Sequence, residues 1–164
     1  MGIQSQNRVY VSMMVDALKR KRDILELLLE KTREQEILLR SDELNSERFN
    51  AIIDEKGEGI DEINTIDEGF DALFRQVKKE ITADRLSYKQ EIEEMQELIA
   101  RVSELGVQIQ ALEHQNSERF KMYLARQRKI IRDFHVNNRT ASNYYQNMAN
   151  VHKPEQSYFF DTAK

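Results

Sequence analysis

A single heptad pattern of apolar residues runs through half of the chain, from Phe49 to Ile130. It is clearest where alternate steps of three and four residues select Tyr88, Glu91, Met95, Leu98, Val102, Leu105, Ile109, Leu112 and Asn116. Seven of these nine residues are apolar or aromatic. A repeat averaging about 3.5 residues keeps one side of a helix against a neighbouring helix, as in coiled coils and bundles. The pattern therefore predicts long helices that pack against one another.

Two further segments carry the same kind of stripe. The second helix is predicted from Phe49, Ile53, Ile60, Ile63, Phe70, Phe74, Val77 and Ile81, with Lys56, Asp67 and Asp84 as polar interruptions. The first is predicted from Val11, Met14, Leu18, Leu25, Leu28 and Leu39, with Lys21, Thr32 and Gln35 as polar interruptions. We expect helices over about 6–40, 46–82 and 88–134.

Short polar residues separate the first two helices. Ser41, Asp42 and Asn45 compete for backbone hydrogen bonds, which favours a turn followed by a helix cap. We expect Asn45 or Ser46 to cap the second helix. Gly57, Gly59 and Gly69 each weaken that helix by about 1 kcal/mol relative to alanine. We expect it to continue through them, because its stripe does, with fraying or a kink near 57–59.

Residues 46–134 can form one continuous helix or two helices joined by a turn at 82–87. The unbroken register favours one helix. The capping-box sequence Ser87-Tyr88-Lys89-Gln90 and the poor helix formers Thr82 and Asp84 favour a turn. A single helix over this range would be about 130 Å long and would have no partner within the chain.

The charge distribution also favours the turn. Segment 8–22 has five bases and one acid, segment 41–68 has ten acids and two bases, and segment 119–139 has seven bases and one acid. In a folded-back chain the bases of 19–22 lie opposite acids of the second helix. The basic stretch that starts at Arg119 lies beside Glu36 and other acids near the first turn. We therefore predict an all-α fold, an elongated antiparallel three-helix bundle or coiled coil over 1–136.

The third helix is expected to outlast the other two, so that its end projects and leaves part of its apolar face unpartnered. That face consists of Phe120, Tyr123, Leu124, Ile130, Ile131 and Phe134. Residues 137–164 lack the heptad, although 140–150 can form a short helix before Pro154. Five of the thirteen aromatic residues lie in 144–160, but this segment has too few apolar residues to fold alone. We expect a mobile aromatic C-terminal tail that docks on the chain's own bundle or on a partner.

No motif indicates catalysis, a cofactor or a metal. The chain has no cysteine, and its histidines, His114, His135 and His152, lack the Glu-x-x-His spacing of di-metal bundles. It shows no phosphate-binding glycine loop, no apolar run long enough to span a membrane and no secretory signal. We predict a cytoplasmic protein that is not an enzyme, with no small-molecule substrate and no membrane insertion.

The order of these features resembles the FlgN family of flagellar export chaperones. The resemblance covers nearly the whole chain: a long first helix, the break at Ser41–Asn45, a second helix, a long third helix and a tyrosine-bearing tail. The most family-like local feature is Leu112-Glu113-His114-Gln115-Asn116 in the third helix. The run Thr140-Ala141-Ser142-Asn143-Tyr144-Tyr145 is similar to members from Gram-positive bacteria.

The resemblance implies a chaperone that binds hook–filament junction proteins (hook-associated proteins 1 and 3), prevents their early assembly and delivers them to the flagellar export gate. Carried over residue by residue, the cargo-binding residues are Phe120, Tyr123, Leu124, Ile131 and Phe134. The candidates for docking at the gate are Tyr144, Tyr145 and Tyr158. Many members have glycine after the tail tyrosine, whereas Tyr145 follows Tyr144 here, so the choice among the three stays open.

Two other functions compete with this one. The long unbroken register is also typical of a self-associating coiled-coil scaffold. The basic segment 119–139 is also typical of a nucleic-acid binder. We favour charge pairing within the chain for that segment and expect no nucleic-acid partner.

Overall fold

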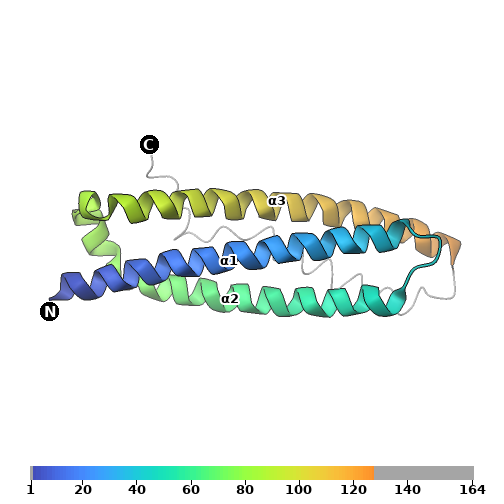
Figure 1. Cartoon of the computed structure of the whole chain (residues 1–164), viewed down its shortest axis with the longest axis horizontal. Coiled ribbons are helices and arrows are strands. Elements are labelled where there is room, and N and C mark those ends of the chain that lie inside the picture. The colour runs from blue at the N-terminus through green and yellow to red at the C-terminus, as the bar shows by residue number, and fades with distance from the viewer. Residues whose placement is uncertain (1, 128–164) are drawn as a thin grey trace.

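The computed structural model shows an elongated bundle of three long helices (Figure 1). These are α1 (Ile3–Arg40), α2 (Ser46–Ala83) and α3 (Lys89–Arg126), with a short 3₁₀ segment, η1 (Arg85–Tyr88), before α3. The structure describes residues 2–127. Each long helix has 38 residues, which corresponds to about 57 Å. The all-α three-helix bundle predicted from the sequence is confirmed for this part of the chain.

The middle position in the bundle belongs to α1. It packs along both other helices, whereas the backbones of α2 and α3 approach each other less closely (Figure 1). Chain order makes α2 antiparallel to its two neighbours, so α1 and α3 run in the same direction. The ends of α1 and α3 therefore meet at one end of the rod, which is where the first turn also lies.

The first turn forms as the polar residues predict. Asn45 caps α2, and its side-chain oxygen accepts a hydrogen bond from the backbone N–H of Arg48 at 3.1 Å. The Ser41 hydroxyl donates to the carbonyl of Glu43 at 3.0 Å. The first bond satisfies a backbone N–H that the start of a helix leaves without a partner, and the second holds the turn itself. The choice of Asn45 as the cap is confirmed.

The predicted turn between the second and third helices is confirmed, so residues 46–134 do not form one helix. Its chemistry differs from the prediction, because the capping box at Ser87 does not form. Tyr88 occupies the cap position of α3 without a side-chain cap bond, and the Ser87 hydroxyl donates to Asp84 Oδ2 at 2.6 Å.

Tyr88 ties the second turn to the rest of the bundle. Its ring is buried beneath the Arg8 guanidinium, 5.0 Å from the ring centroid, and its hydroxyl donates to Glu80 Oε1 at 2.9 Å. Burial, reinforced by that hydrogen bond, raises the pKa of Tyr88 to about 12. Packing and a cation–π contact thus stabilise the start of α3 where a side-chain cap is absent.

The predicted extent of the third helix is wrong. We expected it to reach residue 134, but α3 ends at Arg126, and Gln127 has φ −130° and ψ 80°. The Gln127 backbone N–H donates to the carbonyls of Tyr123 and Leu124, which closes the last turn. Residues 128–164 lie outside the described residues, as do the predicted helix 140–150 and the tail. The division of the chain at 136 therefore stays a prediction.

α2 continues unbroken through its three glycines. At Gly59 α1 approaches α2 closely, because a Cβ built there would lie 2.9 Å from Leu28 Cδ2. A Cβ at Gly57 or Gly69 would meet nothing within 4 Å. Gly59 thus permits close packing, and the other two glycines only weaken the helix.

The core consists of three apolar clusters in sequence along the rod. The first cluster comprises Val11, Met14, Val15, Leu18, Phe70, Phe74, Val77, Ile81, Tyr88, Ile92, Met95, Leu98 and Ile99. The second comprises Ile24, Leu25, Leu28, Leu29, Ile60, Ile63, Val102, Leu105 and Ile109. The third is the smallest and comprises Leu39, Phe49, Ile53, Phe120 and Tyr123.

Most polar interruptions of the three stripes meet one another between these clusters, whereas Asp84 lies exposed at the second turn. Lys21 and Asp67 form a buried ion pair at 2.8 Å between the first and second clusters. A second group separates the second cluster from the third, and we call it the Lys56 layer. Its buried members are Thr32, Gln35, Lys56, Glu113 and Asn116. The buried interruptions are therefore matched partners in the folded chain.

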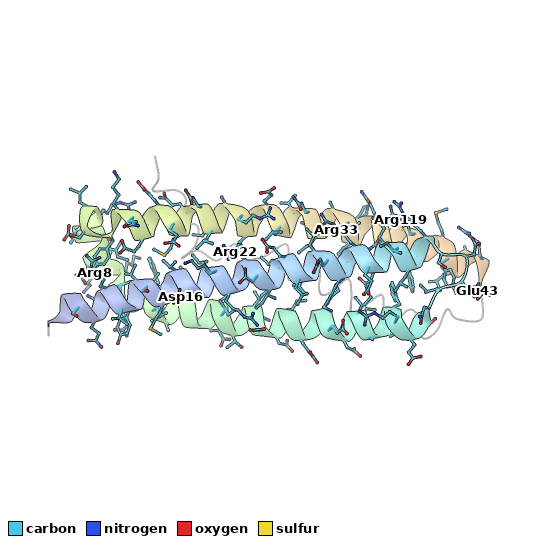
Figure 2. All side chains as sticks on the ribbon, viewed as in Figure 1. Arg8, Asp16, Arg22, Arg33, Glu43 and Arg119 are labelled. Carbon is cyan, nitrogen blue, oxygen red and sulfur yellow. The ribbon has the colours of Figure 1, made fainter. Side chains whose placement is uncertain are left out.

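Charged side chains cover the outside of the rod (Figure 2). Some of the predicted charge pairing is present: Arg20 lies 2.7 Å from Glu62, and Arg119 lies 3.3 Å from Glu36. Lys121 instead pairs with Glu118 of its own helix at 3.1 Å. Exposed pairs of this kind contribute up to about 1 kcal/mol each, so they favour the fold's alignment more than its stability.

Candidate functional site

The predicted cargo-binding residues within α3 lie in or against the third apolar cluster, at the end of the bundle. Phe120 is 3% exposed and Tyr123 is 9% exposed, and Leu124 packs half-buried against the cluster. Phe120 also stacks on Phe49 of α2, with ring centroids 5.4 Å apart. Phe120 and Tyr123 therefore do not belong to the part of this face that was expected to be unpartnered, because α1 and α2 reach far enough to cover them.

The other predicted site residues cannot be placed. Ile131 and Phe134 on the cargo-binding face, and Tyr144, Tyr145 and Tyr158 in the tail, lie outside the described residues. The structure thus brings together three of the five cargo-binding candidates, all on the last two turns of α3. Met122 lies beside them and is 61% exposed.

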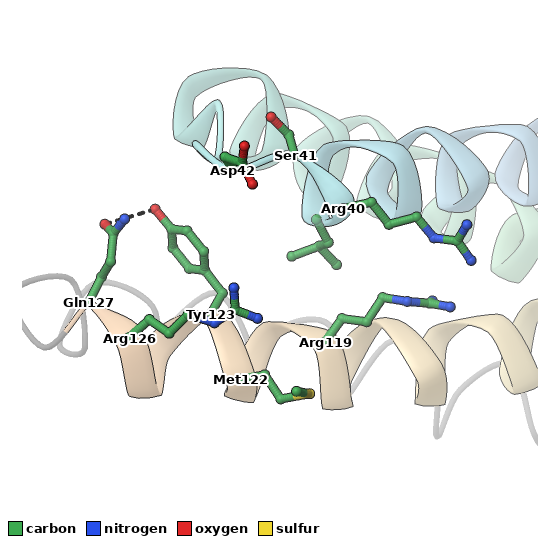
Figure 3. A pocket seen from close by; sticks show the side chains of 9 residues that line it. Arg40, Ser41, Asp42, Arg119, Met122, Tyr123, Arg126 and Gln127 are labelled. Atoms are coloured by element: carbon green, nitrogen blue, oxygen red, sulfur yellow. Dashed lines mark hydrogen bonds between the residues drawn. The ribbon is translucent and has the colours of Figure 1, made fainter.

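A pocket of about 310 Å³ opens at the same end of the rod, between the ends of α1 and α3 (Figure 3). We call it the end pocket. Its apolar lining comes from Leu39, Met122 and Tyr123, and its polar lining from Arg40, Ser41, Asp42, Arg119, Arg126 and Gln127. Figure 3 shows the Tyr123 ring standing between α3 and the turn that carries Ser41 and Asp42. Two helices far apart in sequence build this pocket, because they end at the same level.

Arginines give the end pocket a positive character. Arg40 and Arg119 share the carboxylate of Glu36, at 3.4 Å and 3.3 Å. Arg119 also donates to Asn116 Oδ1 at 3.0 Å. Arg126 has no ion-pair partner within residues 2–127. Three guanidinium groups around an apolar floor favour a ligand that carries both carboxylates and apolar side chains.

The Tyr123 hydroxyl is held by the end of its own helix. It donates to Gln127 Oε1 at 3.0 Å, a bond drawn in Figure 3. The ring faces the third cluster while its polar tip lies at the rim of the end pocket. Tyrosine is suited to such a boundary because one end is apolar and the other binds polar groups.

The Lys56 layer isolates the third cluster from the rest of the core. Lys56 Nζ donates to Glu113 Oε1 and, at 2.7 Å, to Gln35 Oε1. Asn116 Nδ2 donates to the Thr32 carbonyl at 3.0 Å. Burial lowers the pKa of Lys56 and raises the pKa of Glu113 to about 6, although the attraction between the two charges opposes both shifts. A small cluster separated in this way can open without unpacking the other two.

The described residues do not suggest other chemistry. They contain no group of three His, Cys, Asp or Glu side chains placed to hold a metal ion. No helix among them combines the length and apolar composition that crossing a membrane requires. What the end of the bundle offers is a partly exposed apolar surface rimmed by positive charge, which is suited to binding a polypeptide segment.

Sequence reasoning missed the end pocket. It placed the basic stretch that starts at Arg119 beside Glu36 and its acidic neighbours, and the pairing of Arg119 with Glu36 is present. It did not identify Leu39, Met122 or Arg126 as neighbours, because it extended the third helix beyond the other two. The available signal was that α1 and α3 run in parallel after two turns, which brings their ends together.

A family model described as FlgN protein matches residues 11–152 of the chain. The match includes α2, η1 and α3 completely and most of α1. A search of curated proteins gave no match, and a search of solved structures gave none either.

Proposed function

Because the chain belongs to the FlgN family, whose members are flagellar export chaperones, we propose that it binds hook–filament junction proteins and delivers them to the export gate. Hook-associated proteins 1 and 3 are the proposed cargo. Binding in the cytoplasm keeps these subunits from assembling early, and the proposed role requires no catalysis.

The observation that carries the proposal is the partly exposed apolar surface at the end of α3. Met122 is exposed, Leu124 is half-buried, and the end pocket opens beside Tyr123. An amphipathic helix of the cargo can cover this surface as a helix binds in a groove. The proposed contact continues onto Ile131 and Phe134, which follow in the sequence.

The size of this surface suits reversible binding. Covering a few hundred Å² of apolar area at about 25 cal/mol per Å² gives several kcal/mol. The costs of association and of ordering side chains offset part of that energy. A chaperone must release its cargo at the gate, so moderate affinity fits the role.

The third cluster supports a second step in binding. It has five buried members, and the Lys56 layer separates it from the larger clusters. We propose that cargo first covers Met122 and Leu124 and then gains access to Phe120 and Tyr123 as this end of the bundle loosens. Local opening of a small isolated cluster costs less free energy than global unfolding.

The test is the affinity of the purified chain for purified hook-associated proteins, measured by titration calorimetry. The double variant Leu124→Ala/Ile131→Ala is expected to weaken binding by about 10- to 100-fold, since it removes two apolar side chains from the contact. Val107→Ala is the matched control, because Val107 is 67% exposed on the same helix but lies away from its end.

Thermal unfolding of each variant shows whether the bundle is intact. Equal affinity of the double variant and the wild type would overturn the assigned face. Equal weakening by Val107→Ala would show that the whole of α3, not its end, contacts the cargo.

A further inference from the structure

The end pocket lies where the described chain stops, and its own C-terminal residues have the complementary chemistry. We propose that Glu155–Asp161 of the same chain dock into the end pocket and cover it until a partner displaces them. Docking of the segment does not depend on the proposed function, whereas its displacement by cargo rests on that function.

The pocket side of this contact is basic around an apolar floor. Arg40, Arg119 and Arg126 line it together with Leu39, Met122 and Tyr123. Asp42 is the one acidic side chain in the lining. An arginine fork binds a carboxylate through two parallel hydrogen bonds and also stacks on aromatic rings.

The segment side has acids flanking aromatics. Residues 155–161 read Glu-Gln-Ser-Tyr-Phe-Phe-Asp, with one carboxylate at each end and three consecutive aromatic residues between them. Each carboxylate can pair with an arginine of the rim, while Tyr158, Phe159 and Phe160 cover the apolar floor. By contrast, residues 128–139 carry four bases and one acid, so that segment is repelled by the same arginines.

The chain is long enough to reach. Gln127 lines the end pocket, and residues 128–154 separate it from the docking segment. An extended chain covers up to about 3.3 Å per residue, so this many residues are long enough to return to the end pocket. Tethering raises the local concentration of the segment to the millimolar range, so even weak docking is populated.

Docking places the segment against residues proposed to bind cargo. Met122 and Tyr123 line the pocket, and Leu124 follows in the chain. A cargo helix that covers these side chains must remove the segment first. The tail then acts as a competitor that lowers affinity for weak partners.

Pairs of introduced cysteines test the docking without any cargo, because the chain has no cysteine of its own. The full-length variant Ser41→Cys/Ser157→Cys pairs the pocket rim with the segment. The control Ser46→Cys/Ser157→Cys places the first cysteine at the same end of the bundle but outside the pocket. Both first positions are exposed serines next to the first turn, so the tail reaches both equally well when undocked.

Disulfide formation under mild oxidation is followed on non-reducing gels. The Ser41 pair is expected to close about tenfold faster than the Ser46 pair, as a docked segment has a higher effective concentration there. Adding Phe159→Ala/Phe160→Ala, or separately Arg126→Glu, is expected to reduce the rate to that of the Ser46 pair. Neither change touches the third cluster, so the bundle stays folded, and thermal unfolding checks this.

Equal rates for the two cysteine pairs would overturn the proposal. Disulfides that form between molecules would overturn it too, and would point to a second copy as the occupant of the pocket. Addition of a purified hook-associated protein then tests competition. A slower Ser41 closure supports it. If the rate is unchanged while cargo is bound, competition is refuted and docking stands. If no cargo binds, only the proposed function is refuted.

Discussion

At the scale of single residues, the Lys56 layer shows how polar interruptions of an apolar stripe can fix the alignment of the helices. Lys56 and Glu113 come from α2 and α3, and Gln35 and Thr32 from α1. The layer therefore links the two helices whose backbones approach each other least. Any shift of a helix by one turn would leave a charge buried without its partner, so the layer favours one alignment of the helices.

Substitutions in the layer test this account. Lys56→Met leaves the Glu113 carboxylate buried without its ion-pair partner and is expected to lower the free energy of unfolding by about 3–5 kcal/mol. The double variant Lys56→Met/Glu113→Leu is expected to recover at least half of that loss, since both charges are removed. Chemical denaturation measures both. A double variant as unstable as the sum of the single variants would contradict the coupling.

The pH dependence of stability tests the burial of Glu113. Its pKa is about 6 in the folded chain against an ordinary value of 4.5. The folded state therefore binds this proton more readily than the unfolded state does, and the group's contribution to stability increases as the pH falls from 7 to 4.5. We expect the wild type to gain about 2 kcal/mol over Glu113→Gln across that window, at about 1.4 kcal/mol per pKa unit. A constant difference between the two unfolding free energies would refute the shift.

At the scale of elements, α2 shows which glycines serve packing. Gly59→Ala places a methyl group 2.9 Å from Leu28 Cδ2, in a buried part of α1, whereas Gly57 and Gly69 have free space around them. Alanine in a helix is favoured over glycine by about 0.5–1 kcal/mol. We expect Gly57→Ala and Gly69→Ala each to raise the free energy of unfolding by that amount.

Gly59→Ala is expected to give no gain or a loss, because strain against Leu28 offsets the gain in helix propensity. Urea denaturation of the three variants under the same conditions provides the comparison, and Gly57→Ala is the matched control two residues away. Equal stabilisation by all three variants would mean that α1 and α2 can separate slightly without cost.

The heptad, the polar break near Ser41 and the charge segments predicted the three elements, their order and the Asn45 cap, because these depend on local chemistry. The predicted capping box at Ser87 did not form. Tyr88 is buried at the turn and itself occupies the cap position of α3, so Ser87 cannot cap the helix. The end of α3 was missed because the apolar pattern continues beyond Arg126. The end pocket depends on two helix ends meeting in space, which no single-helix pattern contains.

At the scale of the whole molecule, the apolar stripes of residues 2–127 pack mainly against one another, and the end of α3 stays partly exposed. All three helices contribute their stripes to the three clusters, and most charged residues face outward, apart from the buried pairs Lys21–Asp67 and Lys56–Glu113. The scaffold alternative required a stripe left free for another copy. We therefore expect a monomer whose mass by light scattering does not change with concentration. A mass that rises with concentration would restore that alternative.

In the proposed function, the end of α3 and the residues after it receive the cargo. Hydrogen exchange of the full-length chain, with and without a purified hook-associated protein, tests this most directly. We predict that bound cargo slows exchange over residues 117–134 and leaves the helices around the first cluster unchanged. Slower exchange around the first cluster, with none at the end of α3, would contradict the claim.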